Sequence, residues 1–224
     1  MRNITIGFFF FIIAGGCKTY SYFRSSNDFL NKDCQVFLID RTEVNGKLTI
    51  QFETGHDIDK YLKIQTGANA EKKIFITDIQ YYKYKDEYYF PKEISVEAYE
   101  IPYRDKMYLP NVNNLLFVKR LTKEGAKIQF FELFKSRNNS PDGIDQYDYY
   151  ISFNNENRFV AWNIRGTKFF PNFEEKMSKI VSDCPSLAEK IKQKMDGYAL
   201  RQIAVDAKKY EVIRKIVDEY NSCK

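Results

Sequence analysis

The sequence has a single histidine, His56, among 224 residues, and this scarcity narrows the chemistry open to it. A zinc site of the His-Glu-x-x-His kind needs two histidines. A Ser-His-Asp hydrolase would have to use His56, and no Gly-x-Ser-x-Gly segment is present to display its serine. We interpret His56 as a polar loop residue, and we predict no metal site, no cofactor and no catalytic residue.

Other motifs of fixed spacing are missing too. There is no Cys-x-x-Cys pair and no glycine-rich phosphate loop, which argues against redox, zinc-ribbon and nucleotide-binding classes. Asp142, Asp145 and Asp148 have oxygen ligands that suit calcium, but their order is not that of an EF-hand. The turn sequence Pro141-Asp142-Gly143 explains this segment without a metal.

The amino terminus is typical of an exported protein. Arg2 precedes an 11-residue apolar run, Ile4–Ala14, which is shorter than the roughly 20 residues that cross a bilayer as a helix. The small residues Ala14, Gly15 and Gly16 follow, and then Cys17. This order resembles the lipobox of bacterial lipoproteins, although leucine is usual where Ala14 stands. We therefore predict a signal peptide at 1–16 and lipid attachment at Cys17; the alternative is ordinary secretion.

Removal of residues 1–16 would leave 208 residues with a net charge of +4, since Arg2 is the charge that is lost. Charges of both signs are interspersed, so we expect no nucleic-acid partner. We expect a lipid-anchored protein of the cell envelope, on the outer membrane and facing the periplasm, with surface exposure as an alternative. Residues 17–33 are polar and are interpreted as a lipidated tether.

Residues 34–166 have the pattern of an antiparallel β body of hairpins. Segment 35–39 and the alternating segment 47–52 indicate two strands, with a hairpin turn at Asn45-Gly46 between them. Residues 72–90 predict a hairpin that ends at Pro91, a residue typical of a break or an edge. Two further hairpins are predicted at 115–135, with Gly125 in the turn, and at 147–164, with Trp162 in its core.

A belt of tyrosines is the most suggestive binding feature. It includes Tyr82, Tyr84 and Tyr89, which on an exposed sheet face would stack on sugars or anchor a protein. Alternation along strands favours the other interpretation, in which half of these rings fill the core and the others pack across strands.

Residues 167–224 predict a helical tail. Apolar residues repeat at helical spacing from Phe173, and a second helix begins at Asp183-Cys184-Pro185, with a capping side chain, and ends at Gly197. A third runs from Leu200 to the end. With Cys17 lipidated, three cysteines remain, and we favour a disulfide between Cys184 and Cys223 because both lie in this tail. The alternative is that all three thiols are free and buried.

Three segments resemble β-rich envelope proteins of bacteria of the Bacteroides–Flavobacterium type. They are the strand pair Phe117–Ile128 and the closing helical segments Asp183–Ile191 and Ile216–Asn221. The resemblance covers most of the mature chain and implies a β body closed by helices. It implies no catalytic residues.

These observations predict an α+β protein in which an antiparallel β body is followed by a helical tail packed on it. The function we expect is non-catalytic: an envelope lipoprotein that binds a protein or a glycan, or serves as a structural module. The alternative is a periplasmic hydrolase whose site is assembled from residues distant in the sequence.

Overall fold

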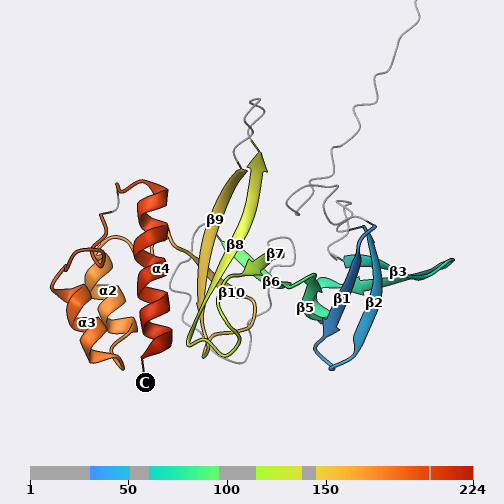
Figure 1. The fold of residues 1–224 in the computed structure, drawn as a ribbon, viewed down its shortest axis with the longest axis horizontal. Coiled ribbons are helices and arrows are strands. Elements are labelled where there is room, and N and C mark those ends of the chain that lie inside the picture. The colour runs from blue at the N-terminus through green and yellow to red at the C-terminus, as the bar shows by residue number, and fades with distance from the viewer. Residues whose placement is uncertain (1–30, 51–60, 96–114, 138–144, 202, 224) are drawn as a thin grey trace, which may run out of the picture.

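Strands come first along the chain and helices last, so the protein has the α+β class that the sequence predicted. The computed structural model describes residues 31–50, 61–95, 115–137, 145–201 and 203–223. Within these ranges one sheet has ten strands, and three helices follow it (Figure 1). The strands are β1 (Asp33–Leu38), β2 (Glu43–Ile50), β3 (Tyr61–Gly67), β4 (Ala70–Phe75), β5 (Ile79–Tyr84), β6 (Glu87–Ser95), β7 (Leu115–Arg120), β8 (Ile128–Arg137), β9 (Asp145–Phe153) and β10 (Val160–Asn163). The helices are α2 (Phe173–Ile180), α3 (Pro185–Lys192) and α4 (Asp206–Ser222), and a 3₁₀ turn, η1 (Ile76–Asp78), precedes β5.

The sheet closes on itself at one end. Its strand order is β10-β9-β8-β7-β6-β5-β1-β2-β3-β4, and β10 also pairs in parallel with β6. Strands β6 to β10 therefore form a closed ring, which we call the strand ring. The sequence predicted antiparallel hairpins and gave no sign of this parallel pair. Closure gives the ring an inner face and an outer face. Successive residues of a strand point to opposite faces, and both faces are packed against other side chains.

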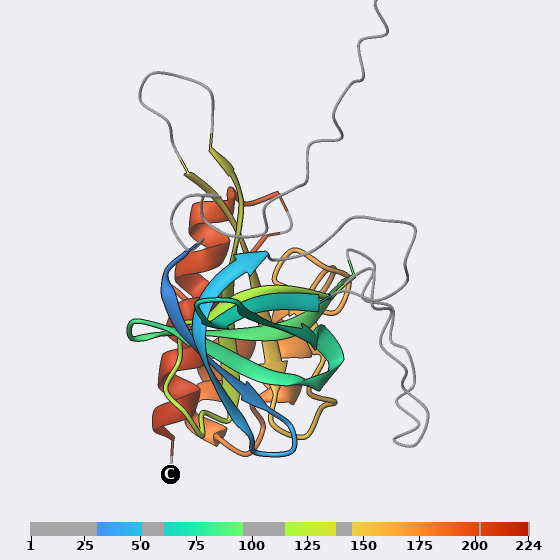
Figure 2. The ribbon, with the colours of Figure 1, turned by 90° about the vertical axis from the view of Figure 1, so that its right-hand side faces the viewer.

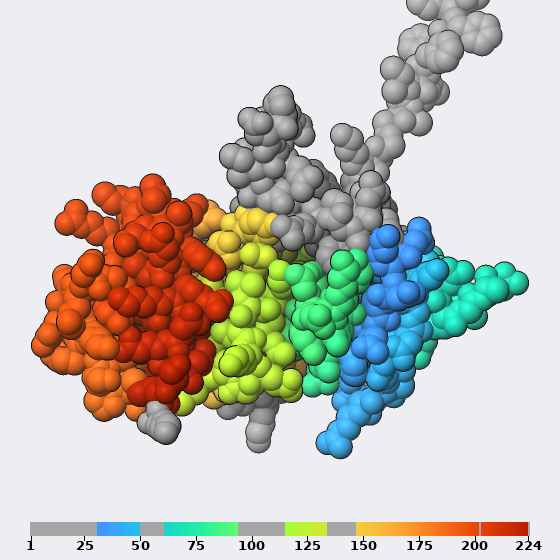
Figure 3. All heavy atoms as spheres, in the orientation of Figure 1, coloured from blue at the N-terminus to red at the C-terminus, as the bar shows by residue number. Residues whose placement is uncertain are grey.

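Apolar side chains form three clusters. One lies inside the strand ring and consists of Val118, Phe131, Leu133, Tyr150 and Ala161. A larger cluster lies between the ring's outer face and the helices, and includes Phe130, Trp162 and Ile216. The third cluster lies along β1 to β5, with Tyr89, Leu115 and Phe117 added from the ring and Phe159 from the position just before β10. Figure 3 shows the helices at one end of the molecule and β1 to β4 at the other, with the ring between them, and Figure 2 views the molecule from the end formed by β1 to β4.

The helical tail covers the ring on the β8 side. Ile213, Ile216 and Val217 of α4 are fully buried, and the ring of Tyr210 stacks on Phe130 of β8. Cys184, just before α3, and Cys223, just after α4, form a disulfide with a Cα–Cα distance of 6.1 Å. This is the pair that the sequence favoured. Cys34, the third cysteine of the predicted mature chain, is a buried free thiol.

The predicted turn at Asn45-Gly46 is wrong, because both residues lie inside β2. The hairpin turns earlier, at 39–42, where Asp40 accepts a hydrogen bond from Thr42 N at 2.8 Å and Arg41 has a φ of 71°. Gly46 serves close packing instead. A Cβ atom there would lie 2.4 Å from Gln65 O on β3.

The predicted hairpin at 72–90 is three strands, because η1 interrupts it. β4 before this turn pairs with β3, whereas β5 after it pairs with β1 and β6. Pro91 does not end its strand but lies within β6. Glu93 donates its N–H to Phe159 O on the β10 side at 2.7 Å, so the nitrogen of Pro91, two residues earlier, faces the same side. On that side, β6 pairs with β5 up to Tyr89 and with β10 from Glu93 onward. Pro91 lies between the two pairings, so its lack of an N–H removes no hydrogen bond of the sheet.

Two helix predictions also need correction. The N-cap of α3 is Cys184, which makes no side-chain capping bond. The side chain of Asp183 does not cap the helix and accepts a hydrogen bond from the Tyr220 hydroxyl at 2.6 Å. The helix ends at Lys192, before Gly197, and the last helix begins at Asp206, not at Leu200. In the part of the chain that the structure describes, no helix combines the length and the apolar character needed to span a membrane.

Candidate functional site

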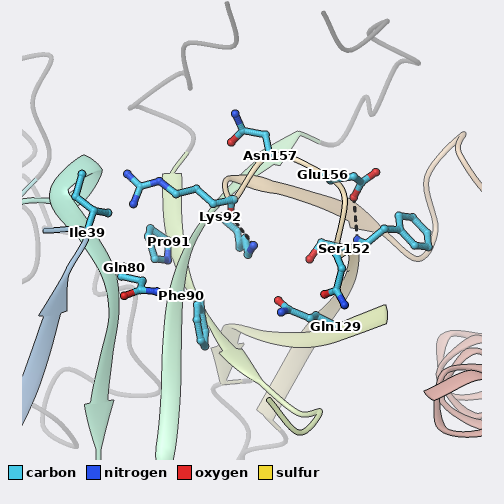
Figure 4. A pocket seen from close by; sticks show the side chains of 12 residues that line it. Ile39, Gln80, Phe90, Pro91, Lys92, Gln129, Ser152, Glu156 and Asn157 are labelled. Atoms are coloured by element: carbon cyan, nitrogen blue, oxygen red, sulfur yellow. Dashed lines mark hydrogen bonds between the residues drawn. The ribbon is translucent and has the colours of Figure 1, made fainter. Parts of the chain in front are cut away.

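A pocket lies at one end of the strand ring, where β6 leaves β5 and joins β10. Its volume is about 330 Å³, and we call it the mouth pocket (Figure 4). It is lined by Ile39, Gln80, Phe90, Pro91, Lys92, Gln129, Ser152, Phe153, Asn154, Glu156, Asn157 and Arg158. The volume is at the lower end of the range for small-molecule sites, about 300–1,000 Å³.

Gln129 and Ser152 are direct cross-strand neighbours on β8 and β9. Phe131 and Tyr150 pair two residues further along and belong to the cluster inside the ring, so Gln129 and Ser152 face the same interior. Neither side chain has a hydrogen-bond partner among the residues that the structure describes. The ring therefore ends, at this mouth, in two polar groups that are directed into the pocket.

Lys92 enters the same space from β6, as Figure 4 shows. It is 5 % exposed, its ammonium donates to Arg158 O at 2.5 Å, and the Phe131 ring centroid lies 5.0 Å from its Nζ. Burial lowers the pKa of Lys92 from 10.5 to about 8, although the charge of nearby Glu156 acts against that shift. No ion pair among the described residues includes Lys92.

The carboxylate of Glu156 is held in place by its own loop. It accepts hydrogen bonds from Phe153 N at 3.0 Å and from Trp162 Nε1 at 2.5 Å, and Lys168 Nζ lies 3.8 Å away. Burial raises the pKa of Glu156, and these two hydrogen bonds act in the opposite direction. Glu156 thus closes the loop between β9 and β10 and is not in direct contact with Lys92.

Arg158 fastens the other rim of the pocket. Its guanidinium donates to the carbonyl oxygens of Thr77 and Ile79, which precede and begin β5. Its own carbonyl accepts from Lys92. The loop that carries Arg158 is therefore joined to both β5 and β6, and the pocket has a fixed frame.

A second hollow of about 890 Å³ adjoins the mouth pocket and shares Phe153, Asn154 and Glu156 with it. Its far side is lined by Lys127, Asp183 and Tyr220, close to the disulfide. Lys127 lies 3.4 Å from Asp183 and covers the Tyr220 ring at 5.0 Å. The charges of this second hollow are paired with each other, unlike Lys92 in the mouth pocket.

The tyrosines singled out from the sequence lie elsewhere. Tyr82 and Tyr89 are buried and stack on each other, with ring centroids 4.8 Å apart, in the cluster of β1 to β5. Tyr84 is half-buried, with Lys85 Nζ 5.3 Å from its ring. These rings contribute to the core and do not form an exposed stacking face. Trp162 is also a core residue, 3 % exposed.

The remaining sequence candidates fall in two groups. Cys17, His56 and Asp142 lie outside the described residues, as does the side chain of Asp145. Asp148 is buried and pairs with Arg165, whose guanidinium also lies 3.4 Å from Asp206. Across the described ranges, no group of three or more His, Cys, Asp or Glu side chains is arranged to hold a metal ion.

Sequence reasoning missed Lys92, Gln129 and Ser152, which we call the mouth residues. On a strand with one solvent-exposed face and one buried face, polar residues at alternate positions are expected to point to solvent. Here both strand faces are packed, so the same alternation directs them inward. The available signal was the position of Gln129 and Ser152 between large apolar neighbours on predicted strands.

Three comparisons with known proteins found no match to this chain. Comparison with models of protein families gives no match. Comparison with curated proteins gives none. Comparison with solved structures also gives none.

Proposed function

We propose that this protein is a lipid-anchored envelope protein that binds a glycan through the mouth pocket, without chemical turnover. The observation that carries the proposal is the set of mouth residues: a buried lysine, an amide and a hydroxyl that converge in one pocket of fixed frame. Small-molecule sites fix the orientation of their ligands with a few convergent polar groups of this kind.

The proposed location rests on two features. The lipobox-like segment that ends at Cys17 supports lipid attachment, with the outer membrane and its periplasmic side as the first choice. The disulfide between Cys184 and Cys223 supports an oxidising compartment, because such bonds persist there and are rare in the cytosol. Replacement of Cys17 by serine should release the protein from the membrane fraction and remove its acyl label. An unchanged membrane fraction would count against the anchor.

Photo-crosslinking in cells tests the binding site itself. Gln80, an exposed residue of β5 that lines the mouth pocket, is replaced by a photoreactive amino acid. The matched control carries it at Lys72, an exposed residue of β4 on the same sheet. We expect glycan adducts at position 80 and not at position 72. Equal adducts at both positions, or none at either, would overturn the proposal.

A hydrolase is the second candidate, because Lys92 and Ser152 share the mouth pocket and are distant in the sequence. Lysine can serve as the base for a nucleophilic serine. However, no hydrogen bond joins these two side chains among the described residues, and Lys92 donates to Arg158 O instead. A fluorophosphonate probe discriminates the two functions: labelling that is lost in Ser152→Ala would establish the hydrolase, and no labelling is expected from a binding protein.

A further inference from the structure

We propose that the group recognised in the mouth pocket is the carboxylate of an acidic sugar, held by Lys92 with Gln129 and Ser152. This inference rests on the proposed glycan-binding function and specifies its ligand.

Lys92 is the charged group among the mouth residues. A buried ammonium is costly unless it is paired. Its acceptor in the described part of the chain is the neutral carbonyl of Arg158, and one carbonyl satisfies one of its three N–H groups. The nearby acid, Glu156, has its oxygens on Phe153 N and Trp162 Nε1. A ligand carboxylate would supply the missing counter-charge.

Two neutral polar groups line the same pocket as Lys92. The Gln129 amide and the Ser152 hydroxyl each offer a donor, and their strands pair at these two residues. Ser152 is 3 % exposed and lines the pocket. Three donors from β6, β8 and β9 thus converge, and an acceptor with two oxygens suits them.

The other lining residues and the volume of the pocket limit the charge and size of the ligand. Glu156 lines the same pocket and opposes a second negative charge, which favours a carboxylate over a phosphate. Asn154 and Asn157 add amides that both donate and accept, as sugar hydroxyls require, and Phe90 and Pro91 add an apolar wall. About 330 Å³ is room for a small unit, such as one terminal sugar.

Titration of the full-length protein with four sugars tests the inference. The probes are glucuronate, glucose, glucosamine and glucose 6-phosphate, and binding is followed by saturation-transfer NMR and calorimetry. We expect glucuronate to bind about tenfold or more tightly than the other three. Lys92→Met should abolish this preference. Lys47→Met removes the same charge from an exposed site on β2 and should preserve it.

The outcomes separate the inference from the function on which it depends. Equal binding of glucose and glucuronate, reduced alike by Ser152→Ala, would overturn the acidic ligand and leave glycan binding in the pocket. Tighter binding of glucose 6-phosphate would also overturn it. If the glycan crosslinked at position 80 in cells contains no acidic sugar, the acidic ligand is likewise overturned and glycan binding in the pocket stands. Thermal unfolding of each variant identifies a loss of binding that comes from a loss of fold.

Discussion

Asn221 of α4 is bonded to Ile128 of β8 in the way that one strand residue is bonded to another. Its Oδ1 accepts the Ile128 N–H at 3.0 Å, and its Nδ2 donates to Ile128 O at 2.9 Å. Ile128 is fully buried, and it is paired on its other edge with Phe153 of β9. One side chain therefore completes the edge of β8 and fixes the end of the last helix on the strand ring.

Asn221→Ala should lower the free energy of unfolding by about 2–4 kcal/mol, because it leaves a buried N–H and a buried carbonyl without their partner. Urea denaturation followed by circular dichroism measures the change. Ser222→Ala is the control: Ser222 is exposed, and its hydroxyl donates to Asp218 O. Its free energy of unfolding should stay within about 0.5 kcal/mol of that of the original protein. Equal effects at the two positions would contradict the role assigned to Asn221.

The disulfide between Cys184 and Cys223 should contribute about 3–4 kcal/mol to the free energy of unfolding, since it closes a loop between cysteines 39 residues apart. Cys184→Ser is expected to lose this stability and to abolish the mobility shift between reducing and non-reducing gels. Cys34→Ser should keep the shift, because Cys34 is a buried free thiol. A shift that depends on Cys34 would show a different pairing.

Burial should also make Cys34 slow to react. Its pKa is raised from 9.0 to about 11 by desolvation, so little thiolate is present at neutral pH. We expect a thiol reagent to modify Cys34 in the unfolded chain and to leave it unmodified in the native protein. Rapid modification of native Cys34, read by mass spectrometry of its peptide, would contradict its burial.

Gly46→Ala should destabilise the protein by about 1–3 kcal/mol, the usual cost of overpacking. The new Cβ would lie 2.4 Å from Gln65 O and 2.6 Å from Ile64 Cγ2, and a backbone oxygen cannot move aside cheaply. Gly67→Ala is the matched control, because its Cβ would lie at an ordinary 3.7 Å from Ala70 Cβ, its nearest neighbour among the described residues. Thermal unfolding of both variants checks the difference, and a Gly46→Ala protein as stable as the control would refute it.

Lys92 should impose a pH dependence on stability. Its pKa is about 8 in the folded protein and 10.5 when unfolded, so between these values the unfolded chain binds the proton and the folded chain does not. The free energy of unfolding therefore rises with pH in this window, by about 3 kcal/mol in total. We expect the difference between the original protein and Lys92→Met to grow by this amount between pH 8 and 10.5. Glu156 and Arg158, the charged groups near Lys92, are present in both proteins, and a constant difference would contradict the shift.

The sequence alone determined the order of elements and several local features. The hairpins predicted at 115–135 and 147–164 coincide with β7, β8, β9 and β10, the positive φ expected at Gly125 is present at 75°, and helical spacing from Phe173 marked α2. These signals are local, because the pattern of apolar residues in a short segment reports which face that segment buries. The choice of Cys184 and Cys223 succeeded for a similar reason, since both lie in the helical tail.

Only the tertiary structure decided how the strands meet. Asn-Gly was interpreted as a turn, but the strand continues through it, and the glycine is explained by β3, which packs too closely to leave room for a side chain at position 46. The pairing of Glu93, Ile94 and Ser95 with Val160, Ala161 and Trp162 joins segments far apart in the sequence, and no local pattern encodes such a pairing. That pairing closes the strand ring. Closure gives the strands a second interior, which turns Lys92, Gln129 and Ser152 away from solvent and into one pocket.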